Sequence, residues 1–506
     1  MYTIALEGWR RGLSLKFNSY KNGNKKDIRY SLSDGMQTHH FEGSGGDLNT
    51  DEAVAVCDDK GLTKQHLAAS SVPVPPGKSF GIEATMGEII EFANKVGFPV
   101  VLKPIDDKGG NGVFVHLRNE HELAEALNES RRKECSGLLI EEHIEGEEVR
   151  VYVLAGQVLA ATKRVPAHVI GDGEKSIKEL IDQKNDDRKN IPHLRHRPIK
   201  IDDKVKRILS SSNLSMESIP KAGETIFLRR TSNISTGGEP IDVTDMLTAE
   251  QKNTAVKAVS SIPGLMHGGV DLLVSQKYKA GAVLEVNAKP GLGSHLFPIE
   301  GEAKDIPGMM LDYYFPKTKK MPGSNSNVYF DFQTIKSSLD SGTLREIKVT
   351  DSPASHLAAK VYKITGDLDP VTYLPWFQKK VLEKELHGFM KKKSEDTTEI
   401  MVAGSSKAEV DAFYEVFSHG SIKSLIAKIE EEDWTKPVKM GFELIDGSRS
   451  LSVQELENKI VNTLRSYERI IKDKEKVEHQ INKVSNSRMW KWTSFIRKLG
   501  KPLRKK

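Results

Sequence analysis

The sequence has few cysteines, no long apolar run and no recognisable leader segment. Only Cys57 and Cys135 occur among its 506 residues, too few for a disulfide framework, which predicts a protein of a reducing compartment. No apolar run approaches the roughly 20 residues of a membrane-spanning helix. The first residues also lack the apolar core of a secretory signal. These absences predict a soluble protein of the cytoplasm.

The composition is typical of a globular chain with several domains. Hydrophobic residues make up 38% and charged residues 29%, which suits a soluble protein with some exposed or helical charged segments. The length predicts roughly three or four domains. The net charge of +5 is small for this length, but the positive charge gathers at the C-terminus.

Oxygen-bearing side chains interrupt two predicted strands in the second half of the chain. Glu285 and Asn287 stand at i and i+2 in the apolar run 283–286, so a strand would point both to one face. Asp271 interrupts a second apolar run, 269–273. Oxygen ligands with room for water and phosphate suit a hard divalent cation. Taken alone, however, the pattern favours the alternative in which both side chains simply face water.

Further motifs decide between these alternatives. Residues 268–272 read GGVDL, residues 284–291 read LEVNAKPG and residues 295–298 read HLFP. With these motifs in this order, residues 51–316 resemble an ATP-grasp ligase. Within that superfamily, the likeness is to the branch of cyanophycin synthetase and the bifunctional glutathione synthetases. The resemblance implies Mg²⁺ or Mn²⁺ bridging the phosphates of ATP, held by Asp271, Glu285 and Asn287.

The same resemblance implies which residues bind the phosphates. Residues 59–77 resemble the family's DK…TK…PVPPG passage, in which Lys60 matches the lysine that reaches toward the nucleotide. Lys103 ends the predicted strand 99–102 and would place a cation against the α- and β-phosphates. Residues 106–112 resemble the mobile lid, because glycines let backbone N–H groups approach phosphate. The lid glycines are Gly109, Gly110 and Gly112. As bare patterns, a surface lysine and an ordinary turn stay open.

Residues 138–149, LLIEEHIEGEEV, match the hinge that receives adenine on its backbone in this family. The resemblance implies adenine contacts from Glu141, Glu142 and Ile144, and places Glu148 at the position of the glutamate that binds the ribose hydroxyls. His143 is interpreted as a wall residue without a catalytic role.

Arginines follow in a passage, 150–173, that resembles the cyanophycin-synthetase-like branch. Guanidinium groups bind carboxylate and phosphate in bidentate fashion. This favours a catalytic role for Arg164, whereas for Arg150 a surface position stays equally open.

A second loop, 228–239, resembles the family's R-x-x-N-x-S-T-G-G segment and implies acyl-phosphate contacts from Arg230, Asn233 and Gly237. Many D-alanine–D-alanine-type ligases carry an arginine two residues before the metal aspartate, where this chain has Gly269. Arg164 or Arg230 would therefore meet the oxyanion charge.

The predicted fold is α/β (α+β), an ATP-grasp fold followed by a ferredoxin-like sandwich and a coiled-coil helix. Short alternating segments at 2–5, 14–17 and 28–32 predict an α/β or strand-rich lead-in. Residues 176–221 are predicted to be a helical, charged cover over the active site. The predicted domains are a lead-in domain (1–50), an ATP-grasp domain (51–316), a linker (317–355), an acylphosphatase-like domain (356–446), a coiled coil (450–486) and a basic amphipathic tail (487–506).

The acylphosphatase-like segment departs from its family at the anion site. Active relatives carry an arginine in the first loop, whereas Asp367 and Asp369 stand in this one. The family's catalytic asparagine falls near Lys392. Because carboxylates repel phosphate, we predict a degenerate, non-catalytic module for binding or assembly.

The C-terminus combines a heptad-like pattern with positive charge. Apolar residues recur at steps of three and four from Val453 to Val484, broken at Thr463 and Lys474, which predicts a coiled coil and hence a homo-oligomer or a partner helix. A single helix packed on its own protein stays open. Residues 487–506 carry eight Lys/Arg among aromatic and aliphatic residues, which suits peripheral contact with the inner face of a membrane. No nucleic-acid-binding motif accompanies this charge.

The resulting hypothesis is an ATP-dependent carboxylate–amine ligase acting on small molecules, with cell-surface glycan or peptide modification as one setting. The resemblance implies that ATP phosphorylates a carboxylate to an acyl phosphate, which an amine then attacks. Two alternatives stay open: a catalytically lapsed ATP-binding scaffold at the membrane, and a thiol or hydroxyl acceptor in place of the amine. The intact metal residues and Lys60 and Lys103 argue against the scaffold.

Overall fold

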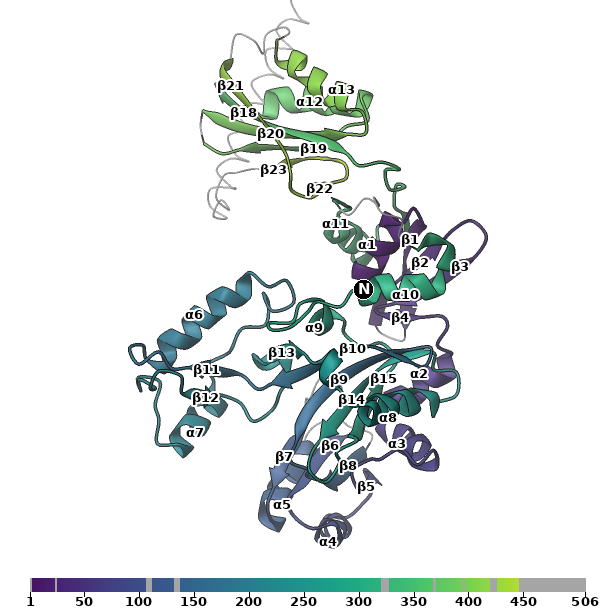
Figure 1. The fold of residues 1–506 in the computed structure, drawn as a ribbon, viewed down its shortest axis with the longest axis vertical. Helices are drawn as coiled ribbons and strands as arrows, with labels where there is room; N and C mark the ends of the chain where they lie inside the picture. The colour runs from purple at the N-terminus through teal and green to yellow at the C-terminus, as the bar shows by residue number, and fades with distance from the viewer. Residues whose placement is uncertain are drawn as a thin grey trace, which may run out of the picture. The chain divides into compact units, whose positions relative to one another are not determined.

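A computed structural model describes residues 2–22, 25–105, 112–131, 137–319, 327–366, 370–394, 396–418 and 426–445. These residues form two compact units (Figure 1). The first unit comprises Met1–His356 and Pro437–Met440, and the second comprises Leu357–Lys436 with the described residues from Gly441 onward. No helix in the described part of the chain is long and apolar enough to cross a membrane.

The lead-in segment is a helix on an antiparallel sheet. Helix α1 (Tyr2–Arg10) precedes strands β1 (Ser14–Asn22), β2 (Lys25–Ser33), β3 (Thr38–Glu42) and β4 (Gly45–Gly46). The prediction of a strand at residues 2–5 is wrong. Ile4, Ala5 and Trp9 are all buried, a spacing that fits one helical face and not strand alternation.

Residues 317–355 were predicted to be a linker, and most of them instead belong to the first unit. Strand β17 (Glu346–Lys348) pairs with β1, and helix α11 (Phe332–Asp340) packs on β1 and β2. Strand β16 (Val328–Tyr329) pairs with β22 (Val438–Lys439). The Lys-, Gly- and Ser-rich residues before position 328 suggested a linker, but the buried Phe330 and Leu339 supply core contacts beyond them.

A four-stranded sheet carries the predicted phosphate lysine Lys103. Its order is β5 (Gly77–Gly81), β8 (Gly137–Glu142), β6 (Val100–Pro104) and β7 (Phe114–Leu117). Helices α4 (Met86–Val96) and α5 (Glu120–Arg131) pack on it through a continuous apolar core. The strands predicted at 99–102, 113–115 and 138–140 are confirmed within about one or two residues at their ends.

The central antiparallel sheet positions the candidate site. Its order is β13 (Glu239–Asp242), β10 (Gln157–Val165), β9 (Glu147–Leu154), β14 (His267–Val274) and β15 (Ala282–Asn287). Helices α2 (Asp51–Asp58), α3 (Lys60–Ala69) and α8 (Ala249–Ser260) share one apolar core with it. Because side chains alternate along a strand, burying Val149, Val151 and Leu272 in this core turns Glu148, Arg150 and Asp271 to the opposite face.

The predicted helical segment 176–221 contains two helices, with turns and irregular backbone between and after them. Helices α6 (Ile177–Lys189) and α7 (Asp203–Ser211) pack with a two-stranded antiparallel sheet, β11 (His168–Ile170) and β12 (Thr225–Phe227), around their own apolar cluster (Figure 1). Capping boxes begin both α6, at Ser176, and α8, at Thr248, because each cap is followed three residues later by Glu or Gln.

A buried histidine joins the lead-in sheet to the central sheet. His267 begins β14, and its Nε2 accepts a hydrogen bond from the backbone N–H of Gly46 (3.3 Å). Nδ1 therefore carries the ring proton and faces the hydroxyl of Tyr152 (3.2 Å). Burial alone lowers the pKa of His267 to about 4. The ring is neutral at pH 7, and its contacts depend on that state.

Acid is expected to destabilise the first unit through His267. A histidine whose folded pKa of about 4 lies below its usual 6.5 adds stability that is full above pH 6.5 and is lost as the pH falls toward 4. The loss should reach about 3 kcal/mol by pH 4. Urea unfolding at pH 7 and pH 4.5 measures it. His267→Gln should show a smaller drop than the exposed control His196→Gln, and equal drops would contradict the assignment.

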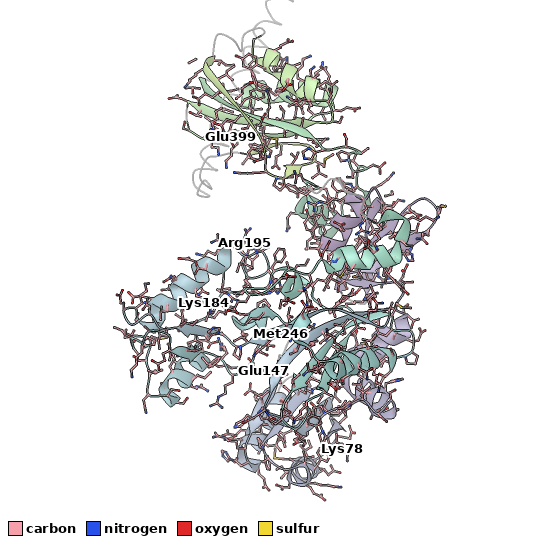
Figure 2. All side chains as sticks on the ribbon, viewed as in Figure 1. Lys78, Glu147, Lys184, Arg195, Met246 and Glu399 are labelled. Atoms are coloured by element: carbon pink, nitrogen blue, oxygen red, sulfur yellow. The ribbon has the colours of Figure 1, made fainter. Side chains whose placement is uncertain are left out.

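The second unit has the predicted ferredoxin-like acylphosphatase architecture. Its sheet order is β21 (Ile426–Asp433), β18 (Ala358–Gly366), β20 (Thr397–Gly404), β19 (His387–Lys392) and β23 (Phe442–Ile445). Helices α12 (Pro370–Glu383) and α13 (Lys407–Ala412) cover one face (Figure 1). Glu399 of β20 pairs with Lys393 at 3.3 Å (Figure 2).

Several predicted features lie outside the described residues. They are Asp367 and Asp369 in the loop that differs from the anion-binding loop of active acylphosphatases, the coiled coil (450–486) and the basic tail (487–506). The homo-oligomer and the membrane contact, which rest on the last two, stay predictions.

Candidate functional site

Strands β14 and β15 bring the three predicted metal ligands together. Asp271 is the direct cross-strand partner of Glu285, and Asn287 lies opposite Gly269. Direct partners in an antiparallel pair point to the same face, and Asn287 follows Glu285 by two residues. All three oxygen-bearing side chains therefore share one face, on the side away from the helices.

The electrostatics of this pair suit a cation. Burial would raise the pKa of Asp271, but Arg150 and Arg164 outweigh it and hold that pKa below its usual value. Burial, followed by the charge of Asp271, raises the pKa of Glu285. The carboxyl groups of Asp271 and Glu285 thus face each other, and the charge of Glu285 is poorly compensated. A divalent ion between them would relieve this repulsion.

The third ligand would have to be an amide oxygen. No group of three His, Cys, Asp or Glu side chains in the described residues could hold a metal ion. Nδ2 of Asn287 is buried without a hydrogen-bond partner among those residues. Two carboxylates and an amide oxygen on one face are a hard-oxygen donor set, so these residues fit Mg²⁺ or Mn²⁺.

Arg150, whose role the sequence left open, lies beside the predicted metal ligands. It is the direct partner of Asp271 on β9 and binds it in bidentate fashion, with Nη2 2.7 Å from Oδ2 and Nε on Oδ1. A Cβ at Gly269 would stand 2.6 Å from Cβ of Pro290 and 3.2 Å from Cδ of Arg150. Glycine at this position thus leaves room for a guanidinium from the neighbouring strand.

Arg164 forms ion pairs with both Glu148 and Asp271, one of the predicted metal ligands. Its Nη1 lies 2.6 Å from Oε1 of Glu148, and its Nη2 lies 3.5 Å from Oδ1 of Asp271. The hydroxyl of Ser232 donates to the other oxygen of Glu148. Sequence reasoning missed Ser232, although it lies inside the R-x-x-N-x-S-T-G-G loop that predicted its neighbours. The adjacent Glu147 pairs with Lys163 instead (Figure 2).

The predicted residues of the loop 228–239 differ in their exposure to solvent and in the contacts that they make. Arg230 is exposed, whereas the neighbouring Arg229 is buried and pairs with Asp202 at 2.8 Å. The carbonyl of Asn233 accepts the N–H of Gly238 (3.0 Å). Gly237 has φ +103°, and a Cβ there would come within 2.7 Å of Ile199, so both backbone and space require glycine.

The end of this loop is tied to the helical segment. Glu239 is buried, with Lys184 at 2.9 Å, His168 at 3.6 Å and Arg188 at 3.7 Å. Lys184 lies on α6, and Arg195 follows that helix (Figure 2). The ion cluster links α6 to β13, next to the strand that carries Arg164.

The nucleotide side contains a buried carboxylate between two lysines. Glu141 binds Lys103 through Oε2 and Lys64 through Oε1, each at 2.5 Å. Burial would raise the pKa of Glu141, but Lys103 and Lys64 lower it below its usual value. Glu141 was predicted as an adenine contact, and Lys64 was missed even though it is the second lysine of the DK…TK passage.

One pocket is lined both by Glu141 with Lys64 and by one of the predicted metal ligands, Glu285. Lys60 also lines this pocket. Nζ of Lys60 donates to the carbonyl of Ile105 (3.3 Å). Lys60 and Lys103 both act to lower the raised pKa of Glu285, which means that the two predicted phosphate lysines lie near this predicted metal ligand.

The hinge and the lid are described in part. Glu142 pairs with Lys277 at 2.6 Å, and its backbone N–H donates to the carbonyl of Pro76 (2.8 Å). Ile144 and His143 are half-buried just after β8, which suits the wall position predicted for His143. Gly112 has φ +67°, while Gly109 and Gly110 lie outside the described residues.

Comparison with known proteins identifies two domains. Residues 57–292 match the model of the ATP-grasp domain, and residues 360–444 match that of acylphosphatase. Cyanophycin synthetase of Trichormus variabilis is 35% identical over 270 residues, which cover 52% of this chain and 30% of the relative. Glutathione biosynthesis bifunctional protein GshAB of Listeria welshimeri is 36% identical over 271 residues, covering 52% and 34%.

Among solved structures, the bifunctional glutathione synthetase from Pasteurella multocida aligns with a TM-score of 0.43 and 26% identity. The alignment covers 57% of this chain and 40% of that one. The chain spans about a third of the length of the curated relatives it matches.

Proposed function

We propose that this chain, which contains an ATP-grasp domain followed by an acylphosphatase-like domain, is an ATP-dependent carboxylate–amine ligase. The observation that carries the proposal is the pairing of Asp271 with Glu285 beside Asn287, at one end of the face that also holds Arg150 and Arg164. The relatives named cyanophycin synthetase and glutathione biosynthesis protein support the same reaction class.

The metal end would bind Mg²⁺ or Mn²⁺ through Asp271, Glu285 and Asn287. When bound, the ion would neutralise phosphate charge as it develops. Lys60 and Lys103 would hold the phosphates, with Glu141 and Lys64 fixing where Lys103 points. The side chain of Glu148 can accept a ribose hydroxyl while keeping Arg164 and Ser232, because a carboxylate has about four lone-pair sites.

Arg150 and Arg164 would orient the acid substrate. Nε of Arg164 is buried without a partner in the described part of the chain, and it can donate to a carboxylate oxygen. The substrate carboxylate attacks the γ-phosphorus and ADP leaves, giving an acyl phosphate. The amine then attacks the carbonyl carbon, and phosphate leaves. Asn233 and Gly237 would shape the loop around the acyl phosphate, with Arg230 at its exposed edge.

ADP formation tests the proposal. Wild type would be incubated with Mg²⁺-ATP and pools of amino acids, dipeptides and amino-sugar acids, beside Lys103→Met and the control Lys78→Met. Lys78 is exposed on the same small sheet (Figure 2). We expect stimulation by an acid with an amine but not with a thiol or alcohol, and a loss of about 100-fold in Lys103→Met alone.

Two results would count against the ligase. If ATP binds and no pool stimulates turnover, the chain would fit an ATP-binding scaffold better. If a thiol or an alcohol stimulates turnover and amines do not, the acceptor chemistry is different. Lys103→Met leaves Glu141 paired with Lys64, so the variant should remain folded.

A further inference from the structure

Polar atoms without partners gather on the face of the sheet that carries Arg150 and Asp271. They are Oγ1 of Thr162, Nε of Arg164, Nδ2 of Asn287 and both ring nitrogens of His295, none of which has a hydrogen-bond partner among the described residues. Thr162 and Arg164 share one face of β10, and Thr162 is the direct partner of Arg150. A buried polar atom without a partner carries a desolvation penalty, so this group indicates a bound ligand.

His295 belongs to this group although the proposed mechanism does not use it. It lies on the short helix α9 (Gly293–Leu296), which packs against β10 and β13. Its backbone N–H donates to Leu292 (3.1 Å), and its carbonyl accepts from Lys304 (2.9 Å). The residue is 1% exposed, so the ring is enclosed while both of its nitrogens are left for another partner.

The ring of His295 packs on the residue that follows Arg150 on the same face of β9. It meets the ring of Tyr152 edge to face, with centroids 6.4 Å apart. Tyr152 follows Arg150 by two residues on β9, and its hydroxyl already forms hydrogen bonds with His267 and Met310. Tyr152 therefore supports the imidazole through packing.

Burial and the charges around His295 keep its ring neutral. Burial first, and then Arg150 and Arg164, lower its pKa to about 3, against the smaller opposing effects of Asp242 and Asp271. A neutral imidazole has one N–H donor and one lone-pair acceptor. The same two arginines disfavour an ammonium group and leave a neutral amine, the nucleophilic form, as the fitting partner.

We propose that His295 hydrogen-bonds the attacking amine, accepting one of its N–H groups and thereby aiming the nitrogen lone pair at the acyl phosphate. The inference rests on the proposed ligase function. In this step the C–N bond forms, the bond from carbon to the phosphate oxygen breaks, and phosphate leaves with that electron pair. The amine proton goes to the departing phosphate, and His295 gains none.

The test separates amine use from acyl-phosphate formation. It uses the acid and amine that stimulate wild type in the pools above, with His295→Phe, His295→Gln and the exposed control His196→Phe. In His295→Phe we expect the KM of the amine to rise about tenfold or more, with unchanged KM for ATP and acid. More ADP than amide should form, since water then consumes the acyl phosphate.

Two further readouts distinguish a substrate contact from a structural role. Hydroxylamine, a small nucleophile that traps acyl phosphates, should yield as much hydroxamate with His295→Phe as with wild type. Thermal unfolding of ligand-free His295→Phe should occur no lower than in wild type, because the substitution removes two unpaired polar atoms. His295→Gln, which keeps a donor and an acceptor, should recover part of the amine affinity.

Other outcomes overturn the inference. An unchanged amine KM with one amide per ADP in His295→Phe would exclude the contact, and so would a fall in hydroxamate. If His295→Phe does not fold, wild-type amine kinetics in a folded His295→Asn, whose shorter side chain cannot reach as far, would exclude it. A wild type without acid- and amine-dependent ADP formation would instead remove the ligase function, on which the inference rests.

Discussion

Replacing Glu285 with glutamine is expected to lower amine-stimulated ADP formation by at least about 100-fold while leaving the ligand-free protein as stable as wild type or more stable. Burial and the charge of Asp271 raise the folded-state pKa of Glu285. A carboxyl with a raised folded pKa weakens folding at every pH above its unfolded pKa, because the unfolded chain ionises more readily. Glutamine removes that charge with nearly the same shape, and it replaces an anionic metal ligand with a weaker, neutral amide oxygen.

This opposite effect on activity and stability is the signature of a metal ligand. Thermal unfolding in EDTA should give an equal or higher midpoint for Glu285→Gln. Mg²⁺-ATP at about 100 times its Kd should stabilise wild type by about 2.7 kcal/mol and the variant much less. The matched control is Glu302→Gln, whose side chain is 81% exposed. Equal Mg²⁺-ATP shifts in wild type and Glu285→Gln would rule out this role.

Replacing Glu141 with alanine should cause the largest loss of stability in the first unit, about 3–5 kcal/mol. The substitution leaves the half-buried Lys64 and the buried Lys103 without their shared counter-charge. The adjacent Glu142→Ala is the control, since Glu142 pairs with a Lys277 side chain that is 55% exposed. Such surface pairs contribute about 0–1 kcal/mol.

Urea unfolding of the two alanine variants at pH 7, followed through the transition of the first unit, makes this comparison. The difference should shrink at acid pH. The depressed pKa of Glu141 adds stability that is present above the usual carboxyl value of 4.5 and lost as the pH falls below it. Equal midpoints for Glu141→Ala and Glu142→Ala would mean that the two lysines find other counter-charges.

Local patterns were sufficient for the strands of the candidate site and for the residues that alternate along them. The i, i+2 spacing of Glu285 and Asn287 fixes their common face once residues 282–287 form a strand, and the apolar runs made that strand predictable. The polar residues before position 328 led to the wrong prediction of a linker over 317–355. Phe330 and Val349 are buried only because residues more than 300 positions away, such as Trp9, complete their core.

Register decided the rest. The sequence favoured a catalytic role for Arg164 but left a surface position for Arg150 equally open. Only the cross-strand pairing sets Arg150 directly beside Asp271, with Gly269 leaving the space. Lys64 is likewise far along the chain from its partner Glu141, and Ser232 is far from its partner Glu148. No pattern among neighbouring residues could therefore predict these pairs.

By itself, the sequence determined the two domain families, the strands of the candidate site and the face shared by Asp271, Glu285 and Asn287, because short-range alternation and ordered motifs carry that information. Tertiary structure alone decided which charges meet. Only packing between distant strands buries Glu141 between two lysines and holds Arg150 on Asp271. The same packing leaves His295 neutral, buried and without a partner among the described residues.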